Sequence, residues 1–343
     1  MPREEKLWER WSRRAVSFGL YGALWLVAVA GFPFWLAGTA LGDLLRGDLR
    51  FPLARSFLFG VFFLSCEALG LIGAFLLWAF LGPWTGGAED RFLAANFRLQ
   101  CLWANALFTG TRVLFELELE VTGEEQLSGP APHLWVRHAS LADTLLPAVL
   151  LGHRHGMRLR WVMKRELLAD PCLDVVGQRL PNVFVRRGSG QAEREIAAIA
   201  RLAETSPPGE GILIYPEGTR FSVERQKRAL ARVAESGSPE RLERVEKLGR
   251  LLPPRLGGPL ALLRARPDLD VVIMGHAGLD GLSHVRDLLD GALIGRRISV
   301  RYWRHAAADL PETEAARADW LDQRWLELDR WLAARLAEDR GDH

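Results

Sequence analysis

The chain has 343 residues, of which 49% are hydrophobic and 25% are charged, and its formal net charge at pH 7 is +2. This length suits one catalytic domain with an accessory segment, while a charge so close to balance argues against a nucleic-acid-binding protein with its clustered basic stripe. The three cysteines, Cys66, Cys101 and Cys172, are widely spaced and form no CxxC pair. This spacing argues against a disulfide framework or a zinc knuckle and indicates a reducing compartment for most of the chain.

Two long apolar segments occupy the N-terminal quarter of the chain. Residues 15–42 contain no charged side chain, and residues 56–82 contain only Glu67. Each segment exceeds the roughly 20 residues that a helix needs to cross a hydrocarbon core of about 30 Å, and the short charged stretch between them suits a turn. We therefore predict that residues 1–88 form a membrane anchor with two transmembrane helices, at about 15–42 and 56–82. Two buried core helices of a soluble protein are the alternative.

The charges around these segments predict the orientation of the anchor. Five basic residues precede the first segment, whereas the turn holds three arginines, so the positive-inside rule places the N-terminus and everything after Gly82 in the cytoplasm. An ionised Glu67 would cost about 2.5 to 3.5 kcal/mol in lipid. We therefore expect Glu67 to pack against the partner helix or the catalytic domain.

From residue 89 onward, short apolar runs alternate with charged stretches, which is typical of an α/β domain. Strands are predicted at 114–121, 133–136, 158–162, 183–185, 211–215, 270–274 and 298–303. Helices are predicted at 143–151, 191–204, 223–235 and 239–251. The catalytic domain would cover residues 89–310. An apolar stripe at helical spacing predicts an amphipathic C-terminal helix in residues 311–343, packed on the core or lying on lipid.

The strongest chemical signal is the sequence Val-Arg-His-Ala-Ser-Leu-Ala-Asp at residues 136–143. A histidine is well suited to take a proton from an alcohol at neutral pH, and a carboxylate on its other nitrogen fixes the tautomer. Residues five apart on a continuous helix diverge by about 140°, so His138 and Asp143 must straddle a turn. Ser140 and Asp143 have the form of a capping box, which would leave His138 in the loop before the helix. Taken alone, the pattern could be an incidental helix cap.

A second motif follows about 75 residues later. Residues 211–220 read Gly-Ile-Leu-Ile-Tyr-Pro-Glu-Gly-Thr-Arg, which is a buried strand that runs into a turn. Such a turn presents backbone N–H groups and a guanidinium to an anion, as phosphate binding requires.

Together the two motifs resemble the glycerophospholipid acyltransferase family, whose archetype is 1-acylglycerol-3-phosphate acyltransferase. The resemblance implies a mixed central sheet flanked by helices, preceded here by the predicted transmembrane helical hairpin. It also implies that His138 is the catalytic base and that Asp143 orients it. The residues that it implies for binding the acceptor phosphate are Glu217, Gly218, Thr219 and Arg220.

Further elements extend the resemblance. Residues 184–187, Phe-Val-Arg-Arg, are similar to a family element that makes Arg187 a second phosphate ligand, and Arg137, Arg186 and Arg255 are further possible contacts. The charged stretch 222–251 is similar to the longer-insert branch, which includes lysocardiolipin acyltransferases. Two departures stand out: Arg137 occupies a position where the family usually has Asn or Ser, and the strand that ends at His276 lacks the usual proline.

The resemblance implies direct acyl transfer, in which His138 deprotonates an acceptor hydroxyl that attacks the thioester of acyl-CoA or acyl carrier protein. The favoured acceptor is 1-acylglycerol-3-phosphate, which would give phosphatidic acid, and another lysophospholipid of the lysocardiolipin type is the alternative. We expect no cofactor and no metal, and we expect backbone N–H groups after Ser140 to bind the oxyanion. Two other interpretations remain: a non-catalytic membrane lipid-binding protein, and a metal hydrolase. The hydrolase would use some of His133, His138, His153, His155 and Asp143.

Overall fold

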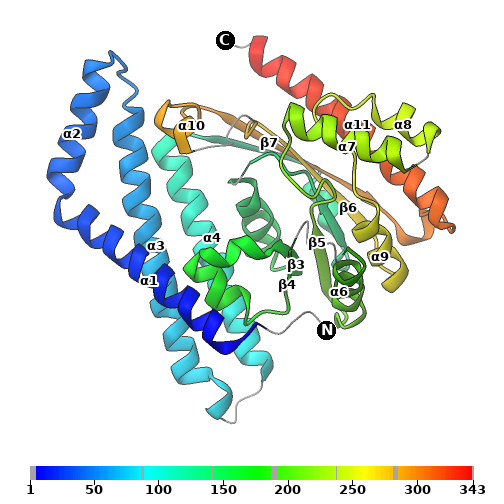
Figure 1. The fold of residues 1–343 in the computed structure, drawn as a ribbon, viewed down its shortest axis with the longest axis horizontal. Coiled ribbons are helices and arrows are strands. Elements are labelled where there is room, and N and C mark those ends of the chain that lie inside the picture. The colour runs from blue at the N-terminus through cyan, green and yellow to red at the C-terminus, as the bar shows by residue number, and fades with distance from the viewer. Residues whose placement is uncertain are drawn as a thin grey trace.

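A mixed sheet of seven strands lies at the centre of the described part of the chain, which comprises residues 5–85, 89–140, 142–186, 192–236, 238–280 and 285–341 of a computed structural model (Figure 1). The strands are β1 (Glu118–Thr122), β2 (His133–Val136), β3 (Arg158–Lys164), β4 (Val183–Val185), β5 (Glu210–Ile214), β6 (Val271–Ala277) and β7 (Arg297–His305). Their order is β1-β7-β6-β2-β5-β3-β4, and β6–β7 is the antiparallel pair. The predicted mixed α/β sheet flanked by helices is therefore confirmed.

Helices cover both faces of the sheet (Figure 1). The helices are α1 (Leu7–Ala30), α2 (Phe32–Leu45), α3 (Pro52–Leu81), α4 (Glu89–Phe115), α5 (Leu145–Pro147), α6 (Ala192–Glu204), α7 (Val223–Glu235), α8 (Pro239–Val245), α9 (Gly257–Ala265), α10 (Val285–Leu289) and α11 (Glu314–Gly341). α3, α4, α5 and α10 pack on one face, and α6 to α9 with α11 pack on the other. Residues 134–136 of β2 are continuously apolar because both faces of this strand are buried. Leu134 and Val136 pack in the core on the α4 side of the sheet, and Trp135 packs in the core on the α11 side.

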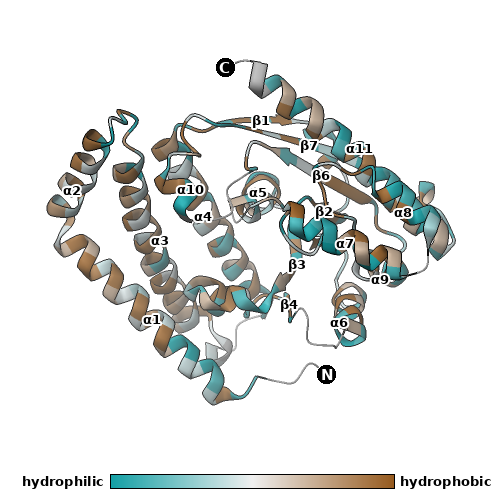
Figure 2. Ribbon diagram, turned by 45° about the horizontal axis from the view of Figure 1, so that its top comes forward, coloured by the Kyte–Doolittle hydropathy of each residue, from teal (hydrophilic) through white to brown (hydrophobic). Residues whose placement is uncertain are grey.

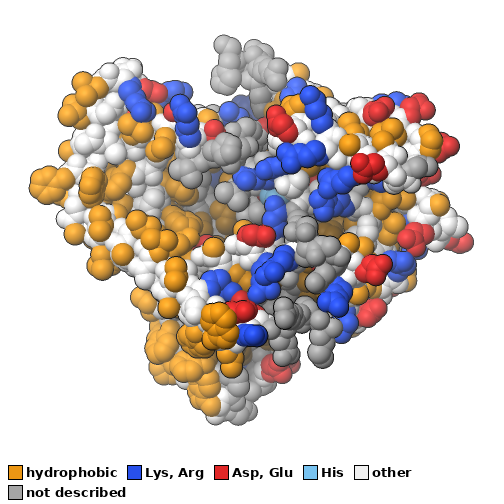
Figure 3. Space-filling model, viewed as in Figure 1, with side chains coloured by type: hydrophobic (Ala, Val, Ile, Leu, Met, Phe, Trp, Pro, Cys, Tyr) orange, Lys and Arg blue, Asp and Glu red, His pale blue; other side chains and the backbone are white. Residues whose placement is uncertain are grey.

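The N-terminal helices expose much apolar surface (Figures 2 and 3). By length and composition, α3 could cross a membrane. α1 and α2 form a bent pair, and they make a second span only if the pair is taken as a single membrane-crossing segment. Only 17% of the most apolar stretch of α3 is buried, which disfavours the alternative of buried core helices. The first predicted span is not one straight helix, because the chain bends by 79° at Gly31. Pro33, at the start of α2, lacks the N–H that would continue α1.

Buried carboxylates join the N-terminal helices α1 to α3 to one another and to the segments that follow them. Asp43, fully buried near the end of α2, accepts hydrogen bonds from the first backbone N–H groups of α3. Glu67 accepts one from Trp103 Nε1 (3.0 Å) and one from the Cys172 backbone N–H (3.1 Å), so it packs on protein as expected. Asp174 binds Arg13 at the start of α1 (2.8 Å). The N-terminal helices thus bind directly to the segments beside the predicted site.

Several element boundaries differ from the predictions. α4 continues to Phe115, so β1 begins at Glu118 rather than at residue 114. The end of α4 packs on the core through Phe108 and Phe115, which are both buried. The helix predicted at 143–151 is instead a 3-10 turn, a single α turn and a π turn, and Pro147 lies at their junction. α8 ends at Val245, earlier than predicted.

The C-terminal segment forms the predicted amphipathic helix, α11, and packs on the core. The side chains that it buries against the sheet are Leu321, Trp325, Leu328 and Leu332. Of the two predicted placements, the structure therefore confirms the one on the core.

Candidate active site

The two sequence motifs meet at the carboxyl ends of the central parallel strands. β2 lies between β5 and β6 and runs parallel to both, so the segment after Val136 and the turn after Ile214 leave the sheet at one edge. The Phe221 backbone N–H donates to the His138 carbonyl oxygen (3.2 Å). Ligands of open α/β sheets bind in crevices at this edge.

His138 and Asp143 form a hydrogen-bonded pair. The distance from His138 Nδ1 to Asp143 Oδ1 is 3.0 Å, and the two side chains are buried. Asp143 Oδ2 also accepts the backbone N–H groups of Ala139 (2.5 Å) and Ser140 (2.7 Å), and Ser140 Oγ accepts the Asp143 backbone N–H (3.2 Å). The turn predicted from the spacing is therefore present. Because Nδ1 faces an acceptor, the hydrogen lies there and the lone pair of His138 lies on Nε2, where a base needs it.

The carboxylate of Asp143 is held in its ionised form. Burial alone would raise its pKa, but hydrogen bonds from His138 and His276 outweigh burial and hold the pKa of Asp143 below its usual range. An ionised Asp143 can stabilise the imidazolium that forms when His138 takes a proton.

Glu217 does not face a substrate phosphate, contrary to the prediction. Its side chain is buried, with Oε1 accepting the His138 backbone N–H (2.9 Å) and Oε2 accepting the Leu252 backbone N–H (3.0 Å). Burial raises the pKa of Glu217 to about 8, although these hydrogen bonds and Arg137 act to lower it. Glu217 thus joins three segments: the turn after β5, the loop that carries His138, and the loop before α9.

The rest of the second motif lies closer to the surface. Gly218 has φ +72°, and a Cβ there would come within 2.8 Å of Arg255 Nε, so only glycine suits this position. Arg255 is itself fixed by its backbone N–H, which donates to the Pro216 carbonyl oxygen (2.9 Å). Thr219 and Arg220 are half-buried. The turn therefore brings Gly218, Arg220 and Arg255 to the same side as His138.

Two arginines that were predicted as possible phosphate contacts, Arg137 and Arg186, do not lie in the pocket beside His138. Arg137 is fully buried and pairs with Asp280, so it cannot reach a substrate phosphate. Arg186 is exposed after β4 and does not line the pocket described below. Arg187 lies outside the described residues, and its predicted role remains a prediction.

A pocket of about 140 Å³ opens beside His138 on the face of the sheet that α4 covers. Its apolar lining includes Trp103, Leu145, Ala148, Trp161, Met163, Leu167 and Leu173. Lys164 and Arg220 line the same pocket, and the Tyr215 ring lies against the His138 imidazole with centroids 4.8 Å apart. His138 thus borders a space with apolar walls and two cationic side chains.

Known proteins resemble this chain in sequence and in fold. Residues 118–257, which hold both motifs, match the Acyltransferase family. A lyso-ornithine lipid O-acyltransferase of Pseudomonas aeruginosa is 33% identical over 122 residues, a match that covers 33% of this chain and 44% of that protein. The crystal structure of the 1-acyl-sn-glycerophosphate (LPA) acyltransferase PlsC from Thermotoga maritima has the same fold, with a TM-score of 0.50 and 15% identity, over 80% of this chain and 96% of that one. Residues 118–257 thus form an Acyltransferase-family region, and the matches together support a glycerophospholipid acyltransferase family.

The sequence predicts oxyanion donors among the backbone N–H groups after Ser140, at the start of the next helical segment. The backbone N–H groups of Ala139 and Ser140 both donate to Asp143 Oδ2, so neither points toward a reacting carbonyl. The Asp143 backbone N–H donates to Ser140 Oγ (3.2 Å), and an oxyanion site among the N–H groups after Ser140 stays a prediction.

Sequence reasoning missed several residues of the site. Trp103 was missed because α4 was not recognised as a helix, although its apolar residues recur at helical spacing. Trp161, Met163 and Lys164 lie on or at the end of a strand that was predicted, but nothing in the sequence indicated that this strand faces His138. Among the described residues, no three His, Cys, Asp or Glu side chains lie together as a metal ligand set.

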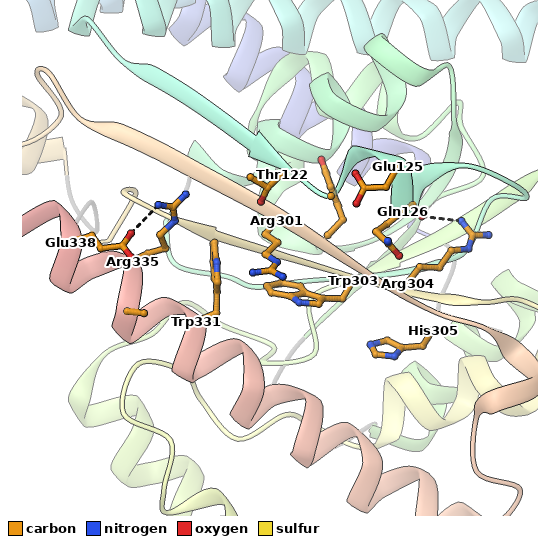
Figure 4. A pocket seen from close by; sticks show the side chains of 13 residues that line it. Thr122, Glu125, Gln126, Arg301, Trp303, Arg304, His305, Trp331, Arg335 and Glu338 are labelled. Carbon is orange, nitrogen blue, oxygen red and sulfur yellow. Dashed lines mark hydrogen bonds and ion pairs between the residues drawn. The ribbon is translucent and has the colours of Figure 1, made fainter.

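A second pocket, of about 500 Å³, lies between α11 and the β1–β7 edge of the sheet (Figure 4). Trp303 and Trp331 meet edge to face there, and the Arg301 guanidinium lies over the Trp303 ring. On β7, Tyr302 enters the core beneath α4 whereas Trp303 packs with the core beneath α11. This pocket therefore lies on the opposite face of the sheet from His138 and is separate from the acyltransferase site.

Proposed function

We propose that this chain is a membrane-bound O-acyltransferase that moves a fatty acyl group from a thioester to the hydroxyl of a lysophospholipid. The observation that carries the proposal is the His138–Asp143 pair, whose free imidazole nitrogen borders a pocket with apolar walls and the cations Lys164 and Arg220. A lysophospholipid has the matching parts: a hydroxyl to deprotonate, an acyl chain and an anionic headgroup.

The reaction needs no covalent enzyme intermediate. His138 Nε2 takes the proton of the acceptor hydroxyl while the oxygen attacks the thioester carbonyl. The tetrahedral intermediate then collapses, the carbon–sulfur bond breaks, and the imidazolium returns the proton to the departing thiolate. Asp143 holds the ring and stabilises its charged form throughout. The products are the diacyl lipid and the free thiol of CoA or of an acyl carrier protein.

The acceptor that we propose is 1-acylglycerol-3-phosphate, which would yield phosphatidic acid. Arg220 supports this proposal, since it lines the pocket with His138 and a guanidinium pairs well with a phosphate. Arg187 is proposed as a second phosphate ligand. A lysocardiolipin-like phospholipid is the alternative acceptor, and the P. aeruginosa relative adds a lyso-ornithine lipid as a third candidate.

The membrane proposal concerns where the reaction occurs. Residues 1–88 would anchor the chain, with residues 89–310 as the catalytic domain and residues 311–343 as a helix docked on it. The exposed apolar side chains of α1 to α3 support contact with lipid. We propose that the catalytic domain faces the cytoplasm, where acyl-CoA and acyl carrier protein are found.

An acceptor panel tests the proposal. The full chain, purified in detergent, is incubated with labelled acyl-CoA or acyl carrier protein and with 1-acylglycerol-3-phosphate, lysocardiolipin or lyso-ornithine lipid. We expect transfer to 1-acylglycerol-3-phosphate and its loss in His138→Ala. Transfer to none of these acceptors by a folded wild-type chain would favour the non-catalytic lipid-binding alternative, and activity that a strong chelator abolishes would favour the metal hydrolase.

A further inference from the structure

A second histidine faces the catalytic carboxylate from the neighbouring strand. His276, on β6, is fully buried, and its Nε2 lies 3.5 Å from Asp143 Oδ2. The same Nε2 lies 3.1 Å from the Arg137 carbonyl oxygen. His138 and His276 therefore approach Asp143 from two adjacent strands, β2 and β6.

The neighbours of His276 fix its tautomer. A carbonyl oxygen and a carboxylate oxygen can only accept, so the hydrogen must lie on Nε2 and point between them. Nδ1 of His276 is buried and has no hydrogen-bond partner among the described residues. A hydrogen placed on Nδ1 would therefore be unsatisfied, which is costly in the interior.

A buried ion pair holds His276 in this position. Arg137 Nη1 donates to the His276 carbonyl oxygen (2.6 Å), and the guanidinium pairs with the Asp280 carboxylate through both of its terminal nitrogens. Arg137 and His276 thus bind each other reciprocally, each through its side chain to the backbone carbonyl of the other. Burial alone would raise the pKa of Asp280, but Arg137 outweighs burial and holds that pKa below its usual value.

We infer that His276 is a positioning residue for acyl transfer: its Nε2–H holds the Asp143 carboxylate toward His138, and the Arg137–Asp280 pair locks His276 in place. This inference rests on the proposed function. It also gives Arg137 a structural role, because its guanidinium reaches from the end of β2 to His276 and Asp280 at the end of β6.

The charges around Asp143 determine the direction of the effect on the pH profile. The titratable and charged groups that face this cluster are His138 and Arg137 from the end of β2, Tyr215 and Glu217 from the turn after β5, Asp280 from the end of β6, and Arg296, which binds the Asp280 carbonyl oxygen. The His276 N–H offsets part of the negative charge on Asp143. Removing this N–H leaves more of that charge to stabilise protonated His138, so the base keeps its proton to higher pH.

Variants of His276 test the inference through the pH dependence of kcat/KM. In His276→Leu, we expect kcat to fall by roughly 10-fold, as the loss of one hydrogen bond to a charged group implies, and the acidic limb of the profile to move to higher pH. His276→Gln can place an amide N–H near the former Nε2 and should restore both. In Asp280→Asn, Arg137 keeps its charge without a counterion, so the acidic limb should move to lower pH.

His133→Leu is the matched control, since His133 is also fully buried but lies at the opposite end of β2 and binds the Arg266 carbonyl oxygen. We expect this control to lower the melting temperature without moving the acidic limb. A folded His276→Leu whose limb does not move, or a folded His276→Gln that restores neither kcat nor the limb, would overturn the inference. If His276→Leu does not fold, the other two variants decide. An acidic limb that stays in place in His276→Gln and moves in Asp280→Asn supports the inference. An acidic limb that stays in place in Asp280→Asn overturns the inference. The proposed function is tested separately, by transfer in the wild type and its loss in His138→Ala.

Discussion

Glu217 gives a prediction that separates a structural role from a substrate-binding one. Its two carboxylate oxygens accept the buried backbone N–H groups of His138 and Leu252, at 2.9 and 3.0 Å. Glu217→Ala leaves both groups unsatisfied, at about 1 to 3 kcal/mol each, so the free energy of unfolding should fall by roughly 2 to 6 kcal/mol. Glu217→Gln keeps one acceptor oxygen, while its amide nitrogen accepts nothing, so about half of that loss is expected.

The raised pKa of Glu217 adds a pH signature. With a pKa of about 8 when folded and near 4.5 when unfolded, the folded state holds a proton that the unfolded state releases between these values. The stabilising contribution is therefore complete below pH 4.5 and is lost as pH rises through 8. Wild-type stability should decline over this range, and Glu217→Gln, which cannot titrate, should decline less.

Thermal unfolding of the detergent-purified chain, followed by tryptophan fluorescence, measures these effects alongside acceptor kinetics. We expect melting temperatures in the order wild type, Glu217→Gln, Glu217→Ala, with kcat falling in the same order because the loop that carries His138 loosens. A Glu217→Ala variant that melts like the wild type and shows only a raised acceptor KM would refute this reasoning. That result would support the prediction that Glu217 binds the acceptor phosphate.

Three further substitutions test neighbouring parts of the site. Arg220→Ala should raise the acceptor KM by roughly 10-fold or more while leaving the donor KM unchanged, since one charge-assisted contact is lost; equal changes in both KM values would contradict this. Gly218→Ala should lower the melting temperature more than Gly209→Ala does: both positions have positive φ, which costs about 1 to 2 kcal/mol, but only at Gly218 does the new Cβ meet Arg255. Asp143→Asn should lower kcat by about 10⁴-fold through loss of tautomer control, and a near-normal rate would remove Asp143 from the mechanism.

Local patterns predicted the parts of the fold and of the site that depend on neighbouring residues. The five-residue spacing of His138 and Asp143 was enough to predict a turn that pairs them, and the hydrogen bond between them is present. The helix at 223–235 was predicted with its observed bounds, because it has a serine cap and a regular apolar face. These features are set within a few residues of the chain.

Contacts between distant segments could not be predicted in this way. Arg137 looked like a surface cation beside the base, and only the fold brings it to Asp280, 143 residues away. Glu217 looked like a ligand until the structure placed two backbone N–H groups against it. α4 was not predicted as a helix, and its end was assigned to a strand from residue 114 because its last turn is rich in β-favouring residues. Packing against the sheet overrides that local preference.

The central claim is that His138 is the base in acyl transfer, and its most direct test is the rate of labelled acyl transfer by purified His138→Ala. The variant should melt close to the wild type and transfer acyl groups at least about 100-fold more slowly, as expected for the loss of a general base. A folded His138→Ala that retains a rate within a few-fold of the wild type would contradict the claim.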